Sequence, residues 1–215
     1  MFENLTVSEF FPTVVWVIDL KPEKFRPMNE RMMRKIEEML TPRPRLGPGE
    51  AWQTHQRLHE LEEFAEFAAC VRGAARGACD FLKIDYDPKS LVITGCWANI
   101  VPPGVSHVSH VHPNNYLSGV YYLKAAPGAD RIGFTDPRPQ ASVIAPRPRE
   151  PNRYNGQEAA MVAKEGRFIL FPAWLRHGVP TNKSSEDRVS VAFNIMLSNY
   201  AERYAAPVWE PNVRG

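Results

Sequence analysis

The spacing of hydrophobic residues along this 215-residue chain changes once, near Pro88. Before that point most apolar residues recur every three or four positions, which is typical of amphipathic helices. After it they alternate with polar residues, which is typical of half-buried strands. The chain therefore divides into a largely helical first part and a β-rich second part.

The first part predicts one strand and two helices. Residues 11–20 are apolar, β-branched and aromatic, which favours a strand. Residues 27–40 carry an apolar residue at every fourth position, which predicts one face of a helix. A longer series with steps of three and four predicts a second helix over residues 58–82.

The second part predicts an all-β core. Its strands are expected at Leu91–Ile100, Val108–His112, Leu117–Leu123, Arg131–Phe134, Arg167–Phe171 and Arg188–Leu197. Helices followed by such strands favour a mainly β member of the α+β class, in which a barrel or sandwich carries the helices outside. We expect a single domain over residues 1–215, with the strand and helices in 1–88 and the β core in 89–200.

One segment within the β core is too rich in proline and arginine to be a strand. Residues 137–157 form a connection longer than is usual in a compact domain, so the segment is either mobile or functional, for example as a lid. Four arginines in it could meet an acidic substrate, or could simply be solvated: Arg138, Arg147, Arg149 and Arg153.

Composition narrows the choice of partners. With 26 basic and 24 acidic residues the formal net charge is +2, so no strong field attracts nucleic acid or an anionic membrane. No run of about 18 apolar residues and no signal-like N-terminus is present, which favours a cytoplasmic protein. Three cysteines without a CxxC pair argue against a disulfide framework or a cysteine zinc site. The expected partner is a small-molecule or peptide substrate, and exposed strand edges are compatible with a homodimer.

Candidate metal chemistry comes from the histidines, four of which lie between positions 107 and 177 of a chain that has six. His110 and His112 are two residues apart on a predicted strand, so their imidazoles should project from one face. His177 follows a strongly apolar run and could complete a site from another strand. Neutral imidazole binds iron, zinc, copper and nickel, so these residues do not identify the metal. The other two histidines, His55 and His59, have no expected role.

A candidate anion site lies in the last predicted strand. Alternation puts Arg188, Ser190, Ala192 and Asn194 on one face. That face is either exposed to solvent or lines a polar cavity. In a cavity, the planar fork of Arg188 and the hydroxyl of Ser190 could together bind a carboxylate.

Three ordered motifs resemble the Fe(II)/2-oxoglutarate-dependent oxygenase superfamily, and within it a group of bacterial and phage oxygenases. They are HVHPNNYLSGVYYL, FPAWLRHGV and RVSVAFN, and the resemblance covers roughly residues 97–194. It implies a double-stranded β-helix, or jelly roll, that holds iron and hydroxylates a substrate while 2-oxoglutarate and O₂ are consumed and succinate is formed. It further implies that Arg188 and Ser190 bind the far carboxylate of 2-oxoglutarate, with Tyr122 and Asn99 as further candidates to line the pocket.

The chain departs from the superfamily at one ligand. The superfamily has HxD or HxE where this chain has His112 as the third residue of the motif. We expect a three-histidine site of His110, His112 and His177, with two histidines plus water as the alternative; His107 and Asp136 lack the spacing of ligands. A three-histidine cupin-like dioxygenase that does not use 2-oxoglutarate, or a non-catalytic sensor of a metal or 2-oxo acid, remains open.

Overall fold

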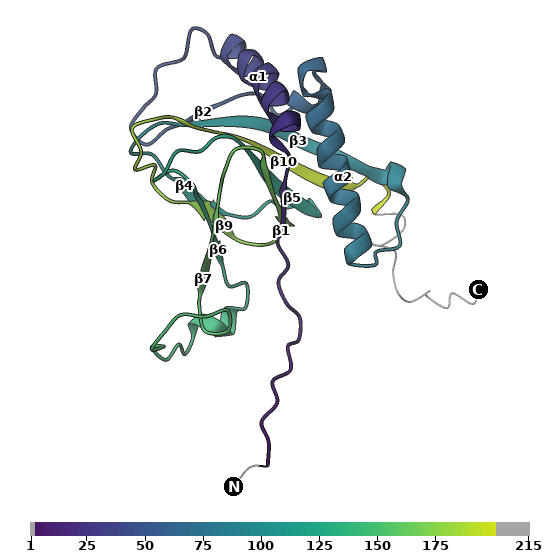
Figure 1. Ribbon diagram of the computed structural model, residues 1–215, viewed down its shortest axis with the longest axis vertical. Coiled ribbons are helices and arrows are strands. Elements are labelled where there is room, and N and C mark those ends of the chain that lie inside the picture. The colour runs from purple at the N-terminus through teal and green to yellow at the C-terminus, as the bar shows by residue number, and fades with distance from the viewer. Residues whose placement is uncertain (1–2, 201–215) are drawn as a thin grey trace, which may run out of the picture.

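The computed structural model describes residues 3–200, so residues 1–2 and 201–215 of the expected domain lie outside the described part. Two antiparallel sheets face each other in it (Figure 1). The larger sheet has the order β1-β8-β5-β10-β3-β2 and the smaller one β4-β9-β6-β7. This arrangement confirms the predicted mainly β fold with a double-stranded β-helix core.

The strand bounds show where the sequence pattern was sufficient. The strands are β1 Trp16–Asp19, β2 Trp52–Gln53, β3 Leu91–Val101, β4 His107–His110, β5 Leu117–Lys124, β6 Arg131–Thr135, β7 Glu158–Val162, β8 Arg167–Pro172, β9 His177–Val179 and β10 Arg188–Leu197. The predicted strand over residues 11–20 is therefore four residues long. The sequence pattern did not predict β2, β7 and β9. Strands β2 and β9 have only two and three residues, too few to establish a period, and β7 is mostly exposed, so it has no alternating buried face.

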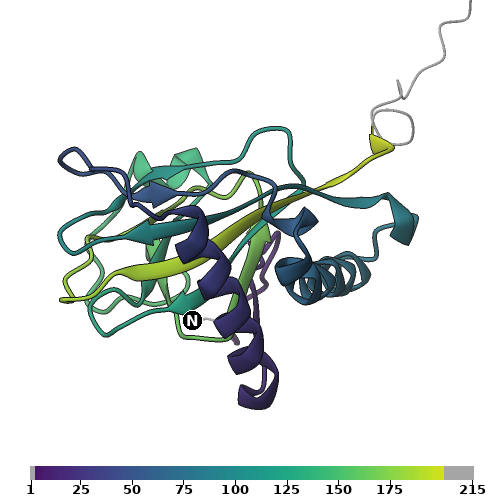
Figure 2. The same ribbon diagram turned by 90° about the horizontal axis from the view of Figure 1, so that it is seen from above.

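Two helices cover the outer face of the larger sheet, α1 (Pro22–Met39) and α2 (Ala65–Phe81) (Figure 2). The aromatic ring of Phe67 in α2 stacks on Phe168 of β8, with 5.6 Å between ring centroids, and contacts Phe193 of β10 edge-on. Burying such rings provides most of the free energy that holds helices on a sheet. A second apolar cluster, which includes Ile132 and Phe171, fills the space between the sheets.

Both predicted helices have different ends in the structure. The first begins at Pro22 rather than at residue 27, because a proline at the first helical position lacks only an N–H that would be unpaired anyway. It continues through Pro27, whose lost hydrogen bond is offset by the burial of the apolar face that follows. The predicted helix over 58–82 is α-helical only from Ala65, since the extended backbone of Leu61 divides residues 58–64 into two short 3₁₀ turns.

The segment over residues 137–157 connects β6 to β7 and extends away from the sheets (Figure 1). It contacts the N-terminal segment, where the hydroxyl of Tyr154 donates a hydrogen bond of 2.6 Å to Glu9. Arg153 forms an ion pair with the same carboxylate.

Elsewhere, the three cysteines are free thiols, as expected. No helix among residues 3–200 is both long and apolar enough to cross a membrane.

Gly119 in the middle of β5 provides a test of the packing between helices and sheet. A Cβ atom at this position would overlap the ring of Phe193 and lie 3.0 Å from the carbonyl oxygen of Ile169. We expect Gly119→Ala to lower the free energy of unfolding by about 1–3 kcal/mol, since a packed core cannot absorb an extra methyl group without strain. Equilibrium unfolding in urea measures this loss.

The matched control is Gly133→Ala in β6, where the nearest atom to an added Cβ lies 3.8 Å away. We expect this variant to unfold at nearly the wild-type urea concentration. Equal midpoints for the two variants would show that the ring of Phe193 yields without cost.

Candidate metal centre and anion pocket

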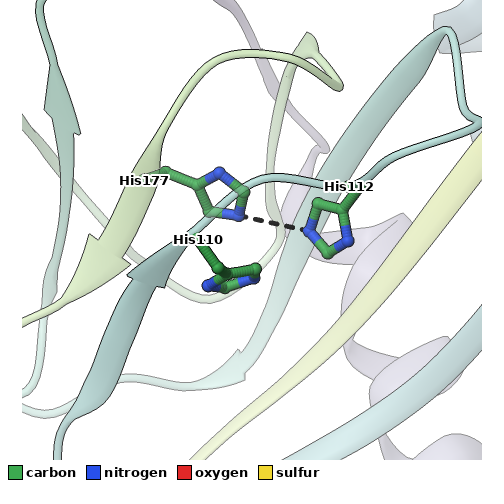
Figure 3. Close-up of side chains that lie close together, drawn as sticks. All are labelled: His110, His112 and His177. Carbon is green, nitrogen blue, oxygen red and sulfur yellow. Dashed lines mark hydrogen bonds between the residues drawn. The ribbon is translucent and has the colours of Figure 1, made fainter.

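The three predicted histidines converge between the sheets (Figure 3). His110 ends β4 and His177 begins β9, and the two residues pair directly across these strands. His112 lies beyond the end of β4, contrary to the predicted strand, and its backbone N–H donates to the carbonyl of Ala173 at 3.0 Å. One ring nitrogen from each of the three lies within 4.8 Å of the others.

Backbone carbonyls determine which nitrogen of two rings carries the proton. Nδ1 of His110 lies 2.8 Å from the carbonyl oxygen of Val108, and Nδ1 of His177 lies 2.8 Å from that of Leu175. A carbonyl oxygen only accepts, so each Nδ1 must donate, and Nε2 of each neutral ring keeps its lone pair. This is the arrangement by which proteins orient a metal-binding imidazole.

Burial favours the neutral form of His112 and of His177. It lowers the pKa of His112 and of His177 to about 4, and it also lowers the pKa of the neighbouring His107. The Nε2 atoms of His112 and His177 lie 3.3 Å apart. Two nitrogens each about 2.1 Å from one metal ion would be roughly 3.0–3.4 Å apart at common coordination angles, so the spacing fits a shared metal.

The other two considered ligands stand outside this cluster. The ring of His107 packs against that of His110 with centroids 4.8 Å apart, but it contributes no nitrogen to the cluster. The carboxylate of Asp136 forms an ion pair of 2.6 Å with Arg138. No Asp or Glu of the described residues lines the pocket that holds the histidines.

Arg188 also lines this pocket and is only 3% exposed. Its Nε has no hydrogen-bond partner among the described residues, and neither does the buried hydroxyl of Tyr122 beside it. Burial lowers the pKa of Arg188, although a guanidinium remains charged near neutral pH. A buried cation without a counter-charge is costly, so the pocket is suited to an anion.

The pocket contains about 470 Å³ of empty space, including space open to solvent. Ser190 and Asn99, both predicted to lie near an anion, also line it. The polar face of β10 therefore lines a cavity rather than facing solvent, which decides between the two expectations for this strand. All seven predicted site residues border this one pocket.

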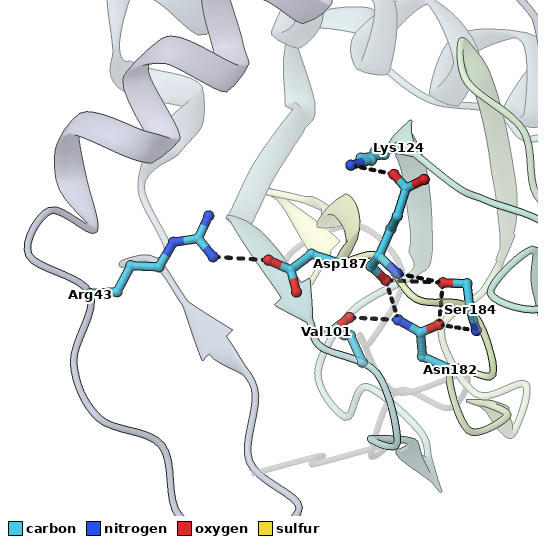
Figure 4. Close-up of polar contacts among 7 residues, drawn as sticks. Arg43, Val101, Lys124, Asn182, Ser184 and Asp187 are labelled. Atoms are coloured by element: carbon cyan, nitrogen blue, oxygen red, sulfur yellow. Dashed lines mark hydrogen bonds and ion pairs between the residues drawn. The ribbon is translucent and has the colours of Figure 1, made fainter.

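The acidic residues that precede Arg188 are neutralised elsewhere (Figure 4). Asp187 forms an ion pair of 2.9 Å with Arg43, and Glu186 one of 2.6 Å with Lys124. The loop before β10 is tied down by the buried side chain of Asn182, whose amide donates to the carbonyls of Val101 and Glu186. Arg188 therefore enters the pocket with its charge uncompensated.

Sequence reasoning missed Trp97, which lines this pocket, and Gln53, which contacts the pocket residue Asn99. Trp97 lies near His112, with ring centroids 6.1 Å apart, and Gln53 donates a hydrogen bond of 2.7 Å to Asn99. Strand alternation could have indicated Trp97, which is two residues from Asn99 on the same face of β3. Nothing in the sequence pattern indicated Gln53, because its strand is only two residues long.

The fold and the cluster define a double-stranded β-helix protein with a candidate three-histidine metal centre. Residues 95–194 match the family described as "Putative 2OG-Fe(II) oxygenase". This match confirms the resemblance drawn from the three motifs. No curated protein matches the sequence.

Several solved structures share the fold. The non-heme alpha ketoglutarate dependent carbocyclase SnoK from nogalamycin biosynthesis is 13% identical, with a TM-score of 0.59 over 86% of this chain and 79% of that one. A Pseudomonas putida prolyl-4-hydroxylase is 11% identical, with a TM-score of 0.59 over 86% and 92%. HygX from Streptomyces hygroscopicus, with nickel and 2-oxoglutarate bound, is 14% identical, with a TM-score of 0.57 over 86% and 83%. At such identities the likeness shows the fold alone.

The contribution of His112 to metal binding can be measured with Ni(II) as the probe. If all three imidazoles bind, His112→Ala should weaken Ni(II) binding more than about 100-fold, because even losing a hydrogen-bond partner of a ligand costs about 10–100-fold. Isothermal titration calorimetry on the purified apoprotein measures the dissociation constant. His107→Ala is the matched control and should change it little. Equal, small losses in both variants would favour two histidines plus water.

Proposed function

We propose that the protein is a non-haem iron oxygenase that hydroxylates a substrate while 2-oxoglutarate is decarboxylated to succinate. The observation that carries this proposal is the buried guanidinium of Arg188, which has no anionic partner among the described residues and shares one pocket with the three histidines. A dicarboxylate bound in this pocket would offset most of the positive charge of the metal and Arg188. The family match and the structural neighbours support the same co-substrate.

In this proposal His110, His112 and His177 hold Fe(II), which supplies the redox chemistry with O₂ when bound. The donor set fits, since a ring nitrogen from each histidine lies within 4.8 Å of the others, and Nδ1 of His110 and of His177 donates to a backbone carbonyl. Arg188 and Ser190 bind the distal carboxylate of 2-oxoglutarate, and the phenol of Tyr122 and the amide of Asn99 add hydrogen bonds.

This chain has His112 where the superfamily has a carboxylate ligand, and this replacement changes the charge in the pocket. Three neutral imidazoles leave the full charge of +2 on the metal, and Arg188 adds one more. A co-substrate of charge −2 would leave +1, whereas a site with one carboxylate ligand would be neutral. We therefore expect the co-substrate to be held firmly, because attraction between charges is strong where water is excluded.

The prime substrate is a small molecule or a peptide in this proposal, and residues 137–157 would close over it as a lid. The lid starts directly after β6, whose Thr135 donates its N–H to the carbonyl of Arg176, the residue before His177. Hydroxylation is the proposed outcome; SnoK is a carbocyclase, so ring closure on the same scaffold is a second outcome that product analysis would separate.

Binding of the co-substrate gives the direct test. Anaerobic Fe(II) protein mixed with 2-oxoglutarate should develop a visible metal-to-ligand charge-transfer band, and titration of that band gives a dissociation constant. We expect Arg188→Ala to raise this constant roughly 10–100-fold, through the loss of charged hydrogen bonds. Arg131→Ala in β6 is the matched control, because this side chain is exposed and lies outside the metal pocket.

Three results would separate the proposal from its rivals. The absence of a band, with Arg188→Ala and the wild type behaving alike, would contradict 2-oxoglutarate as the ligand. Metal binding without 2-oxoglutarate binding would favour a cupin-like dioxygenase. Binding of both without any release of succinate, with or without added substrates, would favour a sensor.

A further inference from the structure

A row of polar residues crosses four neighbouring strands of the larger sheet. In register, Gln53 of β2 lies opposite Asn99 of β3, Asn99 opposite Ser190 of β10, and Ser190 opposite Tyr122 of β5. Residues directly opposite each other on antiparallel strands share a face of the sheet. The last three members line the anion pocket, so Gln53 stands at the outer end of the row. It also lies outside the segment 95–194 that matches the oxygenase family.

One hydrogen bond links Gln53 to the pocket. Its amide Nε2 donates to Oδ1 of Asn99 at 2.7 Å, and Asn99 is only 5% exposed. An amide has an accepting end and a donating end. Because the oxygen of Asn99 is held by Gln53, its NH₂ group is the end left for the pocket. A carboxylate only accepts hydrogen bonds, so this is the orientation that a bound anion requires.

Backbone and side-chain contacts on both sides hold Gln53 in place. Trp52 pairs with Ile100 and donates its indole N–H to the carbonyl of Pro44 at 2.8 Å. On the other side, the N–H of Thr54 donates to the carbonyl of Ala98 at 3.2 Å, and the hydroxyl of Thr54 accepts from the N–H of Ala98 at 3.0 Å. The two-residue strand is thus anchored before and after Gln53.

We propose that Gln53 is a positioning residue for the co-substrate: it holds the Asn99 amide with its NH₂ toward the distal carboxylate that Arg188 and Ser190 bind. This inference rests on the proposed function, because it assigns a role toward 2-oxoglutarate. Gln53 itself does not line the pocket and acts through Asn99. The N-terminal part of the chain therefore contributes to selection of the co-substrate.

The test compares two 2-oxo acids of equal length on Ni(II)-loaded protein by isothermal titration calorimetry. 2-Oxopentanoate has a methyl group where 2-oxoglutarate has its distal carboxylate. We expect Gln53→Leu to raise the dissociation constant of 2-oxoglutarate about 3–10-fold, the effect of one mispositioned hydrogen bond. The constant of 2-oxopentanoate should stay within about twofold, because that ligand has no distal carboxylate to which Asn99 could donate.

A second variant tests the orientation of the amide. In Gln53→Glu the new carboxylate can only accept, so the Asn99 amide should turn and present its oxygen to the pocket. We expect a larger loss of 2-oxoglutarate affinity than in Gln53→Leu. Gln56→Glu is the matched control: it makes the same change of charge three residues away, on an exposed side chain that does not line the pocket.

A double-mutant cycle shows whether Gln53 acts through Asn99. In the Asn99→Ala background, Gln53→Leu should have no further effect on 2-oxoglutarate binding. Two results would overturn the inference and favour a general loosening of the sheet. One is that Gln53→Leu lowers the affinity for 2-oxoglutarate as much in the Asn99→Ala background as in the wild type. The other is that it lowers the affinity for both 2-oxo acids equally. If the wild type binds 2-oxoglutarate and Gln53→Leu binds it with the same affinity, this inference alone is overturned. If the wild type binds no 2-oxoglutarate, the proposed function is overturned as well.

Discussion

Strand β10 has one face toward the apolar core under the helices and the other face toward the polar pocket, and the rest of the structure depends on this arrangement. It lies inside the larger sheet and pairs with β3 on one side and β5 on the other. One set of its alternating residues, which includes Phe193, packs under the helices, and the other set, which includes Arg188, faces the pocket. A shift of register by one residue would bury the guanidinium among apolar side chains and expose the ring, so packing and site specify the same register.

The pocket is unusual in containing buried positive charge without buried negative charge. Arg188 forms no ion pair with a carboxylate of residues 3–200, since the two acidic residues before it are paired with Arg43 and Lys124 outside the pocket. The candidate metal cluster consists of imidazole rings, and no acidic side chain of residues 3–200 lines the pocket. An anionic ligand would compensate the charge of Arg188, so the pocket is suited to bind one.

The site was more predictable than the ends of its elements. His177 and Arg188 could be placed from short motifs, since metal and carboxylate binding demand particular side chains at particular spacings. The reasoning that joined His110 to His112 was partly wrong: β4 ends at His110, and His112 is brought to the cluster by a backbone hydrogen bond to Ala173 rather than by strand alternation. Residues 58–64 were likewise predicted to be helical because 3₁₀ turns and α-helices bury similar spacings of apolar residues.

Local chemistry along the chain determined the fold class, the long β10 and the identity of the candidate ligands, because these depend on periodicity and on residue type. Only the tertiary structure decided that the polar face of β10 lines a cavity, that Arg188 lacks a counter-charge and that Gln53 reaches Asn99. Each of these depends on which segments, distant in sequence, lie side by side. Strand β2 is only two residues long, and its Gln53 pairs with Asn99, 46 positions away in the sequence. So short a strand leaves no periodic pattern in the sequence, yet it places Gln53 in contact with a side chain of the pocket.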